Sequence, residues 1–404
     1  MKKFLQNFSL VFFAFFLSFY LIEIFLTFYQ SDNQKNLLSI YKTRVKNAKL
    51  LNHKIDYRSP EEFYNFVLKE KNIILKKGYI YRKEVFQSKI IKDYKKNSKP
   101  IPFRGPYNSF SFAYNEYLRY EIIENDRYGF KNPDSIYLKN IDLALFGDSF
   151  AEGYGLANQF DISGVLRTKN INAANFGIPG AGPILSYATI KEYIEVLKPK
   201  TVVFLYCEAN DLTDLNFEKK DKYLSKYLDV NYKQGLSSRK KENLVFYNKF
   251  VNEMGNNWSQ TSNFIVSKNK EYFKDIVELT NLKNILREIN YIFFQRKSDV
   301  ENIVKLVDKM RNVSTKHGSN FLFIYLPTWE RYYTKNTKFS KYIGSKKDIL
   351  MSLKKKNINY IDIDKVFIKS VNNIDNYFPL NFYGHYSKEG YSIVAESIAN
   401  YINK

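Results

Sequence analysis

A serine and a histidine in this 404-residue sequence could together attack a carbonyl group. Ser149 ends the motif Gly147-Asp148-Ser149, which directly follows the apolar run from Leu143 to Phe146. A buried strand over that run would deliver the serine hydroxyl to its carboxyl end, where open α/β sheets carry their sites. The motif also fits a plain turn, in which Gly147 gives backbone freedom and Asp148 and Ser149 cap the next helix.

A serine hydroxyl is a weak nucleophile, so a neutral imidazole must accept its proton as it attacks. The sequence has three histidines. His53 lies in a basic segment, and His317 lies at a predicted helix end beside Gly318, where a histidine interacts favourably with the helix dipole. We therefore take His385 as the candidate base.

The predicted elements around these residues alternate between strand and helix, which is typical of a parallel sheet with helices on both faces. The fold class we expect is α/β, a three-layer sandwich with a mostly parallel sheet. The single cysteine, Cys207, excludes an intramolecular disulfide and a multi-cysteine metal site, and its apolar surroundings indicate core packing. After the first strand, the predicted strands are 171–176, 201–206, 320–326 and 359–363, with helices from Pro183, around 300–310 and after Ser387.

Four separated motifs resemble the blocks of the SGNH/GDSL hydrolases, and they occur in the family's order. They are Gly147-Asp148-Ser149, Asn175 to Gly180, Asn210-Asp211, and Gly384 to Gly390 with His385 just before the last helix. The resemblance implies an SGNH/flavodoxin-like fold with Ser149 as nucleophile and His385 as base. It also implies an oxyanion hole formed by the N–H groups of Ser149 and Gly180 and the side-chain amide of Asn210. No metal or organic cofactor is implied.

The sequence departs from the family at two positions. Glu208 stands where the third block commonly has glycine. The family usually places an aspartate three residues before the histidine, and here that residue is Phe382. Three alternatives follow: a main-chain carbonyl or Asn381 orients His385, Asp375 or another acid reaches it from elsewhere, or the site has lost activity.

The first thirty residues predict a membrane anchor. From Phe8 to Tyr29 the sequence is almost wholly apolar, with Glu23 as its one charged residue, and Lys2 and Lys3 precede it. This length suits one transmembrane helix, and no small-residue cleavage site follows it. We expect a single-pass protein of the cell membrane whose body lies in the periplasm or outside the cell. The basic residues after Tyr29, such as Lys35 and Lys42, argue for the opposite orientation.

Three regions are predicted: a cytoplasmic tip and anchor over 1–30, a basic stalk and accessory segment over 31–138, and the SGNH-like domain over 139–404. A helical insertion at about 212–295 interrupts the last region. Ser59-Pro60-Glu61-Glu62 predicts a capped helix start in the accessory segment. Asn125 to Lys131 resembles a lead-in found in some membrane-anchored members of the family.

The net charge of +22 invites comparison with nucleic-acid-binding proteins. The lysines are dispersed along the whole chain and no recognisable nucleic-acid-binding motif accompanies them, so we expect solvated surfaces and no nucleic-acid partner. Anionic lipid or an acidic glycan remains compatible with this charge.

The predicted function is a serine esterase or O-acyltransferase that acts, through a Ser149 acyl-enzyme, on ester groups of a cell-envelope polysaccharide, with O-acetyl the foremost candidate. The expected partners are the membrane and an ester-bearing glycan or small ester substrate, with envelope assembly partners also open. The alternative is a non-catalytic envelope protein with a degenerate SGNH site, which binds a glycan or serves an export assembly.

Overall fold

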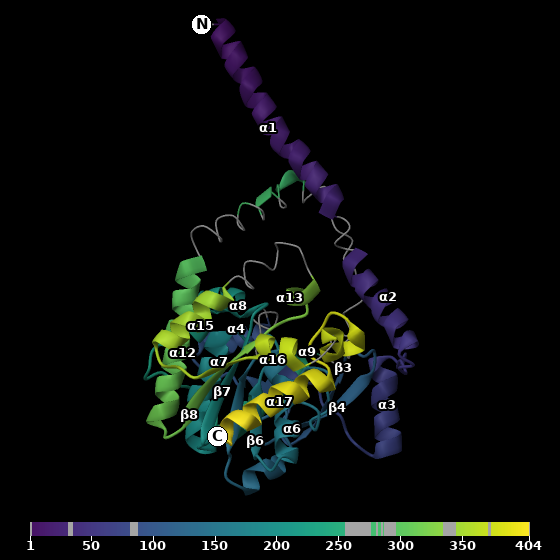
Figure 1. The fold of residues 1–404 in the computed structure, drawn as a ribbon, viewed down its shortest axis with the longest axis vertical. Helices are drawn as coiled ribbons and strands as arrows, with labels where there is room; N and C mark the ends of the chain where they lie inside the picture. The colour runs from purple at the N-terminus through teal and green to yellow at the C-terminus, as the bar shows by residue number, and fades with distance from the viewer. Residues whose placement is uncertain are drawn as a thin grey trace. The chain divides into compact units, whose positions relative to one another are not determined.

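The centre of the chain is a five-stranded parallel sheet with the order β6-β5-β7-β8-β9 (Figure 1). This computed structural model describes residues 2–30, 35–80, 88–254, 276–279, 282–283, 286, 296–333, 345–370 and 373–403. The strands are β5 (Leu143–Gly147), β6 (Ala173–Gly177), β7 (Thr201–Cys207), β8 (Asn320–Leu326) and β9 (Tyr360–Asp362). The flavodoxin-like order brings the carboxyl ends of β5, β6 and β7 together. The predicted α/β class and parallel sheet are confirmed.

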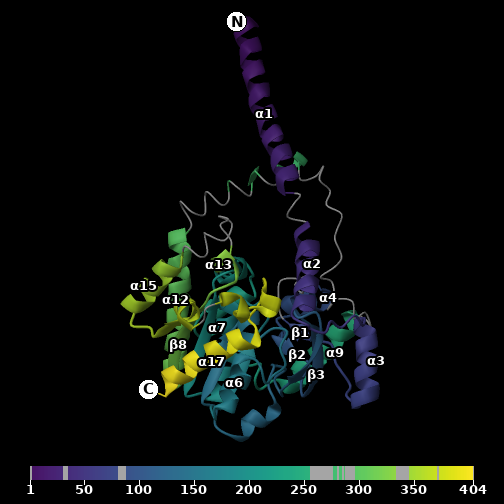
Figure 2. The same cartoon turned by 45° about the vertical axis from the view of Figure 1, so that its right-hand side comes forward.

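Alternate residues of each strand face two separate apolar layers, as the period of two of a strand requires. Phe146, Phe204 and Phe323 belong to the core shared with helices α7 (Pro183–Leu197), α12 (Arg296–Lys316) and α15 (Lys346–Lys355). Leu145, Leu205 and Ile324 belong to the core shared with α6 (Ile162–Thr168), α16 (Ile363–Ser370) and α17 (Lys388–Ile402). Helices thus cover both faces of the sheet, and α6 and α17 lie side by side (Figures 1 and 2).

A β-hairpin before the sheet forms its own small core. Strands β3 (Ser109–Tyr114) and β4 (Tyr120–Asn125) pair antiparallel. Helix α3 (Pro60–Lys71) packs on the hairpin, with Phe63 and Val67 of the helix and Leu75 of the segment after it against Phe112 and Tyr120. The predicted helix start is confirmed, because the Ser59 side chain accepts from the N–H of Glu62 and the Glu62 side chain accepts from the N–H of Ser59.

Apart from the N-terminal helix, the remaining described elements are helices and two short strands before, between and after those above. They are α2 (Lys35–Leu50), β1 (Tyr79–Ile80), α4 (Lys89–Lys96), β2 (Arg104–Gly105), η3 (Asp134–Leu138), α5 (Ser149–Glu152), α8 (Asp211–Glu218), η4 (Leu224–Leu228), α9 (Lys240–Met254), α13 (Glu330–Tyr333), η7 (Ile374–Tyr377) and η8 (Pro379–Asn381).

The N-terminal region forms the helix α1 (Lys2–Gln30). The sequence predicts a transmembrane anchor over Phe8 to Tyr29. Among the helices that the structure describes, none has both the length and the hydropathy needed to cross a membrane, so this expectation finds no support.

The chain divides into two compact units, one of Met1–Thr43 with Asn263–Ser298 and one of Arg44–Ser262 with Asp299–Lys404. In the first, the N–H of Leu282 donates to a carboxylate oxygen of Glu23 at 2.8 Å. The second holds the sheet, the hairpin and every site residue discussed below. Up to Met254, the predicted insertion at 212–295 holds the helices α8, η4 and α9 joined by turns, and most of its remainder lies outside the described residues.

Candidate active site

Ser149 lies at the carboxyl end of β5, as predicted, and begins the one-turn helix α5. Asp148 caps that helix, because its Oδ1 accepts a hydrogen bond from the N–H of Phe150 at 2.9 Å. The parallel register places Gly147 beside Gly177 of β6 and Leu205 of β7. The nucleophile candidate is therefore held at the point where three strand ends meet.

His385 lies within hydrogen-bond distance of Ser149, with 2.8 Å between its Nε2 and the serine Oγ. It precedes α17, whose first turn is capped by the Ser387 side chain accepting from the N–H of Gly390. The rings of Phe150 and Tyr154 lie 4.7 Å and 4.9 Å from the imidazole. The His385 side chain is 19% exposed, so it can be reached from solvent. The structure thus brings together two residues that the sequence predicts as partners.

The acid beside His385 is Glu116, a residue that none of the sequence motifs indicates. Its Oε1 lies 3.1 Å from His385 Nδ1, and its Oε2 accepts the backbone N–H of His385 at 2.7 Å. Asn381, proposed from sequence as the orienting group, is exposed, and Phe382 packs on Trp329 instead. The orienting acid therefore comes from elsewhere in the chain, the second of the three alternatives, and Asn381 does not take that role.

The loop between β3 and β4 positions Glu116. Asn115 Oδ1 accepts the N–H groups of Tyr117 and Arg119, which closes the loop, and its Nδ2 donates to the carbonyl of Gly155 at 2.6 Å. This last bond connects the β3–β4 loop, which carries Glu116, to the segment that follows α5. Gly384 leaves room for the carboxylate, because a Cβ at this position would lie 2.5 Å from Glu116 Oε2.

Arg44 of α2 supports the acid from its other side. Its Nη2 lies 3.3 Å from Glu116 Oε1 and donates to the carbonyl of Tyr383 at 2.9 Å. Arg44 and Glu116 are largely buried, with side chains 11% and 13% exposed. The guanidinium therefore holds the carboxylate and the segment before His385 together.

The pKa values of Glu116 and His385 are shifted in opposite directions by the charges around them. Burial alone raises the pKa of Glu116, but the charge and hydrogen bond of His385, together with Arg44, outweigh burial and leave that pKa lowered. Burial alone lowers the pKa of His385, but Glu116, with smaller contributions from Asp148 and Glu152, leaves it raised. Near neutral pH the carboxylate is ionised, and it stabilises the imidazolium that forms when His385 accepts a proton.

The expected oxyanion donors differ in their availability. The N–H groups of Ser149 and Gly180 donate to no other group within the described chain. Gly180 is exposed and has a φ of +75°, which suits a glycine in a loop that presents its amide. The Asn210 Nδ2, by contrast, donates to Asp148 Oδ2 and to Asp214 Oδ2, at 3.0 Å in both cases. Asn210 lies near the nucleophile, but both of its amide hydrogens are engaged.

Buried carboxylates surround Asn210. Burial raises the pKa of Asp148, against hydrogen bonds from Phe150 and Asn210. Burial and the charge of Asp148 raise the pKa of Asp211 well above its ordinary value, although its carboxylate accepts the N–H of Cys207. Burial also raises the pKa of Glu218 to about 8, even though this side chain accepts three N–H groups at the start of α7. Asn210 therefore lies beside carboxyl groups whose pKa values are raised by burial.

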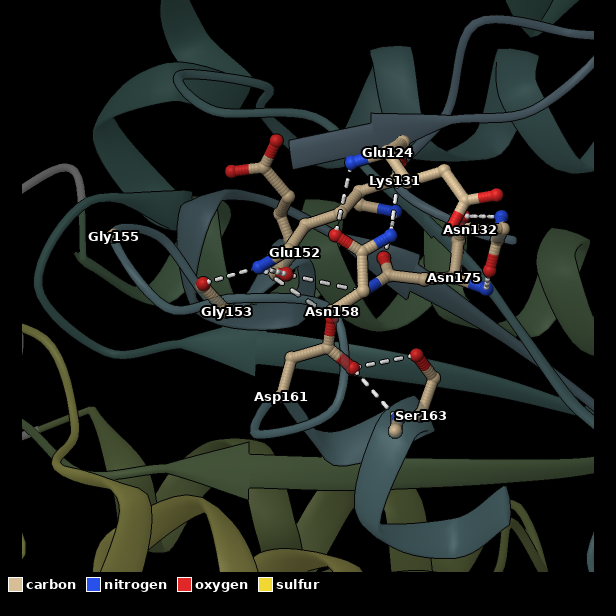
Figure 3. A network of polar contacts seen from close by, with 12 residues as sticks. Glu124, Lys131, Asn132, Glu152, Gly153, Gly155, Asn158, Asp161, Ser163 and Asn175 are labelled. Carbon is tan, nitrogen blue, oxygen red and sulfur yellow. Dashed lines mark hydrogen bonds and ion pairs between the residues drawn. The ribbon is translucent and has the colours of Figure 1, made fainter. Parts of the chain in front are cut away.

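A fully buried lysine, Lys131, anchors the segment that follows α5, and Figure 3 shows its contacts. Lys131 Nζ donates to the carbonyls of Glu152 and Gly153 at 3.2 and 2.8 Å, and lies 3.4 Å from Asp161 Oδ2. A cation suits the carbonyl end of a helix. Lys131, the last residue of the motif Asn125 to Lys131, therefore binds the carbonyl groups at the end of α5, the helix that begins with Ser149.

Two further residues continue this buried network. Asn132 donates to the carbonyl of Asn175 and accepts its N–H, both at 2.8 Å (Figure 3). Arg104 Nη2 lies 2.6 Å from Glu152 Oε1, and both side chains are almost fully buried. The nucleophile helix, β6 and the segment before the sheet are thereby joined by polar contacts that solvent does not reach.

Glu208, the departure in the third block, has a structural role. Its carboxylate accepts hydrogen bonds from Tyr325 Oη and the N–H of Thr328, and it pairs with Arg331. It thereby fixes the segment that follows β8. Cys207, at the end of β7, is buried in the core as predicted.

The described residues contain no group of three or more histidine, cysteine, aspartate or glutamate side chains arranged to hold a metal ion. The chemistry that the site offers comes from the hydroxyl, imidazole and carboxylate in line. These three groups suit nucleophilic attack on an acyl carbon.

No protein-family model matches this sequence, and no curated protein matches it. Among solved structures, the chain is similar to a protein from Desulfitobacterium hafniense DCB-2 assigned to the G-D-S-L family of lipolytic proteins. The identity is 14%, the match covers 65% of this chain and 99% of that one, and the TM-score is 0.35. The chain is also similar to the acetyl xylan esterase AlAXEase, with 12% identity over 64% of this chain and 98% of that one, and a TM-score of 0.36. Because these scores are low, we base the function on the geometry of this chain.

Proposed function

We propose that this chain is a serine ester hydrolase of the SGNH/GDSL type. The observation that carries the proposal is the continuous line from Glu116 through His385 to Ser149, with 3.1 Å and 2.8 Å between the paired atoms. A carboxylate on one imidazole nitrogen and a hydroxyl on the other is the arrangement that activates a serine.

In the proposed reaction, Ser149 Oγ attacks the ester carbonyl while its proton moves to His385 Nε2. The tetrahedral intermediate collapses, His385 returns that proton to the leaving alcohol, and the acyl group remains on Ser149. A water molecule then attacks the acyl carbon, gives its proton to His385, and the carboxylic acid leaves as Ser149 is reprotonated. If a sugar hydroxyl replaces water in the second step, the same intermediate gives acyl transfer.

Glu116 holds His385 in the tautomer that carries hydrogen on Nδ1, so that Nε2 can accept the serine proton. The N–H groups of Ser149 and Gly180 are the first donors to the oxyanion. Asn210 also donates to the oxyanion once one of its Nδ2 hydrogens no longer bonds Asp148 or Asp214. Each donor of this kind contributes roughly 3 to 4 kcal/mol to the stability of the transition state.

A fluorophosphonate probe tests the proposal directly, because it reacts covalently only with an activated serine. We expect the purified chain to be labelled, and labelling to be lost in Ser149→Ala and strongly reduced in His385→Ala. Ser238→Ala, which changes an exposed serine on a surface turn, should label like the parent protein. A chain that takes up no probe would contradict the proposal and favour the non-catalytic alternative.

We also propose a biological substrate, an O-acetylated polysaccharide of the cell envelope, which an esterase or an acyltransferase could use. This part of the proposal rests on the location expected from the N-terminal sequence. A protease-protection assay on membranes and an assay for acetate release from envelope glycans test the two parts separately.

A further inference from the structure

Helix α2 contacts the segment before His385 through two polar side chains, Arg44 and Asn47. The Arg44 Nη2 donates to the carbonyl of Tyr383, and the Asn47 Nδ2 donates to the carbonyl of Leu380, at 2.9 Å in both cases. Residues three apart on a helix lie on the same face, so the two side chains reach the segment together. We call this pair the α2 clamp. Both of its members and the segment that they hold belong to the second compact unit.

The segment that the α2 clamp holds contains an unfavourable turn. Leu380 and Asn381 each have a φ of +55°, in the left-handed region that residues with a side chain rarely adopt. The N–H of Asn381 donates to the carbonyl of Phe378 at 3.1 Å, which closes the turn but does not attach it to the rest of the site. The bond from α2 to the Leu380 carbonyl supplies such an attachment, a few residues before His385.

The same helix contacts the acid of the site. Arg44 Nη2 lies 3.3 Å from Glu116 Oε1, the oxygen that also meets His385 Nδ1. In the segment that follows α2, the ring of His53 lies 5.4 Å from the ring of Tyr117, the residue next to Glu116. Helix α2 and the residues after it therefore contact both the loop of the acid and the segment of the histidine.

Apolar packing contributes little to the docking of α2. Ala48 is fully buried, but no described side chain of α2 belongs to any of the three apolar cores. The alternative is that the α2 clamp only fastens the helix to the body of the chain. Any buried carbonyl of the body would serve that purpose, whereas both clamp bonds and the Arg44 ion pair end on groups that set the position of His385.

We propose that Arg44 and Asn47 are positioning residues of the active site, and that α2 must be docked for His385 to face Ser149. The inference rests on the proposed ester hydrolase and adds to its site a helix that the sequence predicts to be part of a basic stalk. The clamp acts through the main chain before His385, which keeps the imidazole 3.1 Å from Glu116 and 2.8 Å from the serine. A displacement of about 1 Å can cost 10²-fold in rate, so release of the clamp should remove most of the activity.

Two variants test the α2 clamp without changing the charge beside His385. Asn47→Ala removes one clamp bond, and Arg44→Lys keeps the cation but loses the planar guanidinium and part of its reach. We expect each variant to lower kcat for a soluble acetate ester by about tenfold, and the double variant by about 10²-fold, while KM stays nearly unchanged. Lys46→Ala, which changes an exposed residue of the same helix, should keep the parent kcat. An unchanged kcat in the double variant would overturn the inference.

The pKa of His385 reports its position independently of catalysis. Burial lowers this pKa, but the charge of Glu116, with smaller contributions from Asp148 and Glu152, leaves it raised above 6.5. Neither clamp variant removes any of these charges. A change in the pKa therefore measures a change in the distance between the imidazole and the carboxylates.

Nuclear magnetic resonance of the full-length chain, labelled at its histidines, measures that pKa. We expect it to fall toward 6.5 in Asn47→Ala and in Arg44→Lys, and to keep the parent value in Lys46→Ala. The midpoint of urea unfolding should change little, because the clamp lies outside the apolar cores. A lower urea midpoint with an unchanged pKa of His385 would mean that the clamp only fastens α2, and would overturn the inference.

The titration also separates the α2 clamp from the proposed function. A parent chain that cleaves no ester and takes up no fluorophosphonate would contradict the hydrolase. In that chain, a pKa of His385 that falls in Asn47→Ala would still support the clamp, and a pKa that does not change would overturn it.

Discussion

Glu116 and His385 lie 269 positions apart in the chain and share two hydrogen bonds. One carboxylate oxygen meets the ring nitrogen Nδ1, and the other accepts the backbone N–H of the same residue. The carboxylate therefore fixes both the orientation of the ring and the position of its backbone. Its role does not depend on the aspartate that the family usually carries before the histidine.

Glu116→Gln should leave substrate binding nearly unchanged and lower kcat strongly. The amide keeps the shape of the side chain but loses the charge that stabilises the imidazolium and selects the tautomer. In a serine-protease triad the equivalent loss costs about 10⁴ in kcat, or roughly 5 to 6 kcal/mol. Steady-state kinetics on a soluble acetate ester measure the effect, and a decrease of less than tenfold would remove Glu116 from the mechanism.

The pH profile should reflect the raised pKa of His385. His385 must be neutral to accept the serine proton, so kcat/KM is low at acidic pH and rises as pH increases through that pKa. Because Glu116 raises the pKa, we expect the midpoint to lie above 6.5, the ordinary value for histidine. In Glu116→Gln the midpoint should move to lower pH, while Glu121→Gln, on the adjoining strand, should leave it in place. A midpoint that is the same in all three proteins would contradict the assignment.

Gly384→Ala should impair catalysis without changing a charged residue. Its new Cβ would lie 2.5 Å from Glu116 Oε2, so the carboxylate must move away from His385. We expect kcat to fall toward the value of Glu116→Gln while KM changes little. Gly78→Ala is the matched control, because a Cβ at Gly78 meets no atom within 4 Å. Full activity in Gly384→Ala would show that this close approach does not matter.

Asn210 and Asp214 should have opposite effects on turnover. Asn210→Ala removes a donor to the oxyanion, and we expect kcat to fall by about 10²–10³. Asp214→Ala frees an amide hydrogen of Asn210 that the carboxylate now holds at 3.0 Å, so kcat should rise. Measuring both variants on one ester separates these effects. A decrease in Asp214→Ala would mean that this carboxylate positions Asn210 and does not compete for it.

Lys131→Met should destabilise the fold because it removes the buried cation that lies 3.4 Å from the fully buried carboxylate of Asp161. Removing one partner of a buried ion pair costs roughly 3 to 5 kcal/mol of unfolding free energy. The exposed pair of Lys200 and Asp142 offers a control, since Lys200→Met should cost roughly 0 to 1 kcal/mol. Urea denaturation of the two variants makes the comparison, and equal losses would contradict a special role for Lys131.

The sheet could be predicted because its signals are local. The run Thr201 to Tyr206 is continuous and apolar, and the structure extends the strand by one residue, to Cys207. The predicted sheet needed only periodicity, caps and strand ends. The pairing of Ser149 with His385 was predicted from the motifs that resemble those of the SGNH/GDSL hydrolases, together with the elimination of the other two histidines.

The role of Glu116 as the acid that orients His385 could not be predicted from such local signals. The residues around Glu116 carry a local signal, since Ser109–Tyr114 and Tyr120–Asn125 have the composition of paired strands. That signal indicates a hairpin, but it does not tell where the hairpin loop docks. The contact with His385 depends on Asn115 binding Gly155 and on the space beside Gly384, both of which are tertiary features. The role of Glu208 likewise depends on Arg331, which is distant in sequence.

The hairpin core of Phe63, Val67, Leu75, Phe112 and Tyr120 is much less extensive than the layers on either side of the sheet. Segments with fewer buried contacts open at lower free energy than the body of a protein. If the hairpin and α3 separated transiently from the sheet domain, Glu116 would move away from His385 while the rest of the chain stayed folded. The proposed activity would then be lost under mild heat or denaturant before the whole chain unfolds.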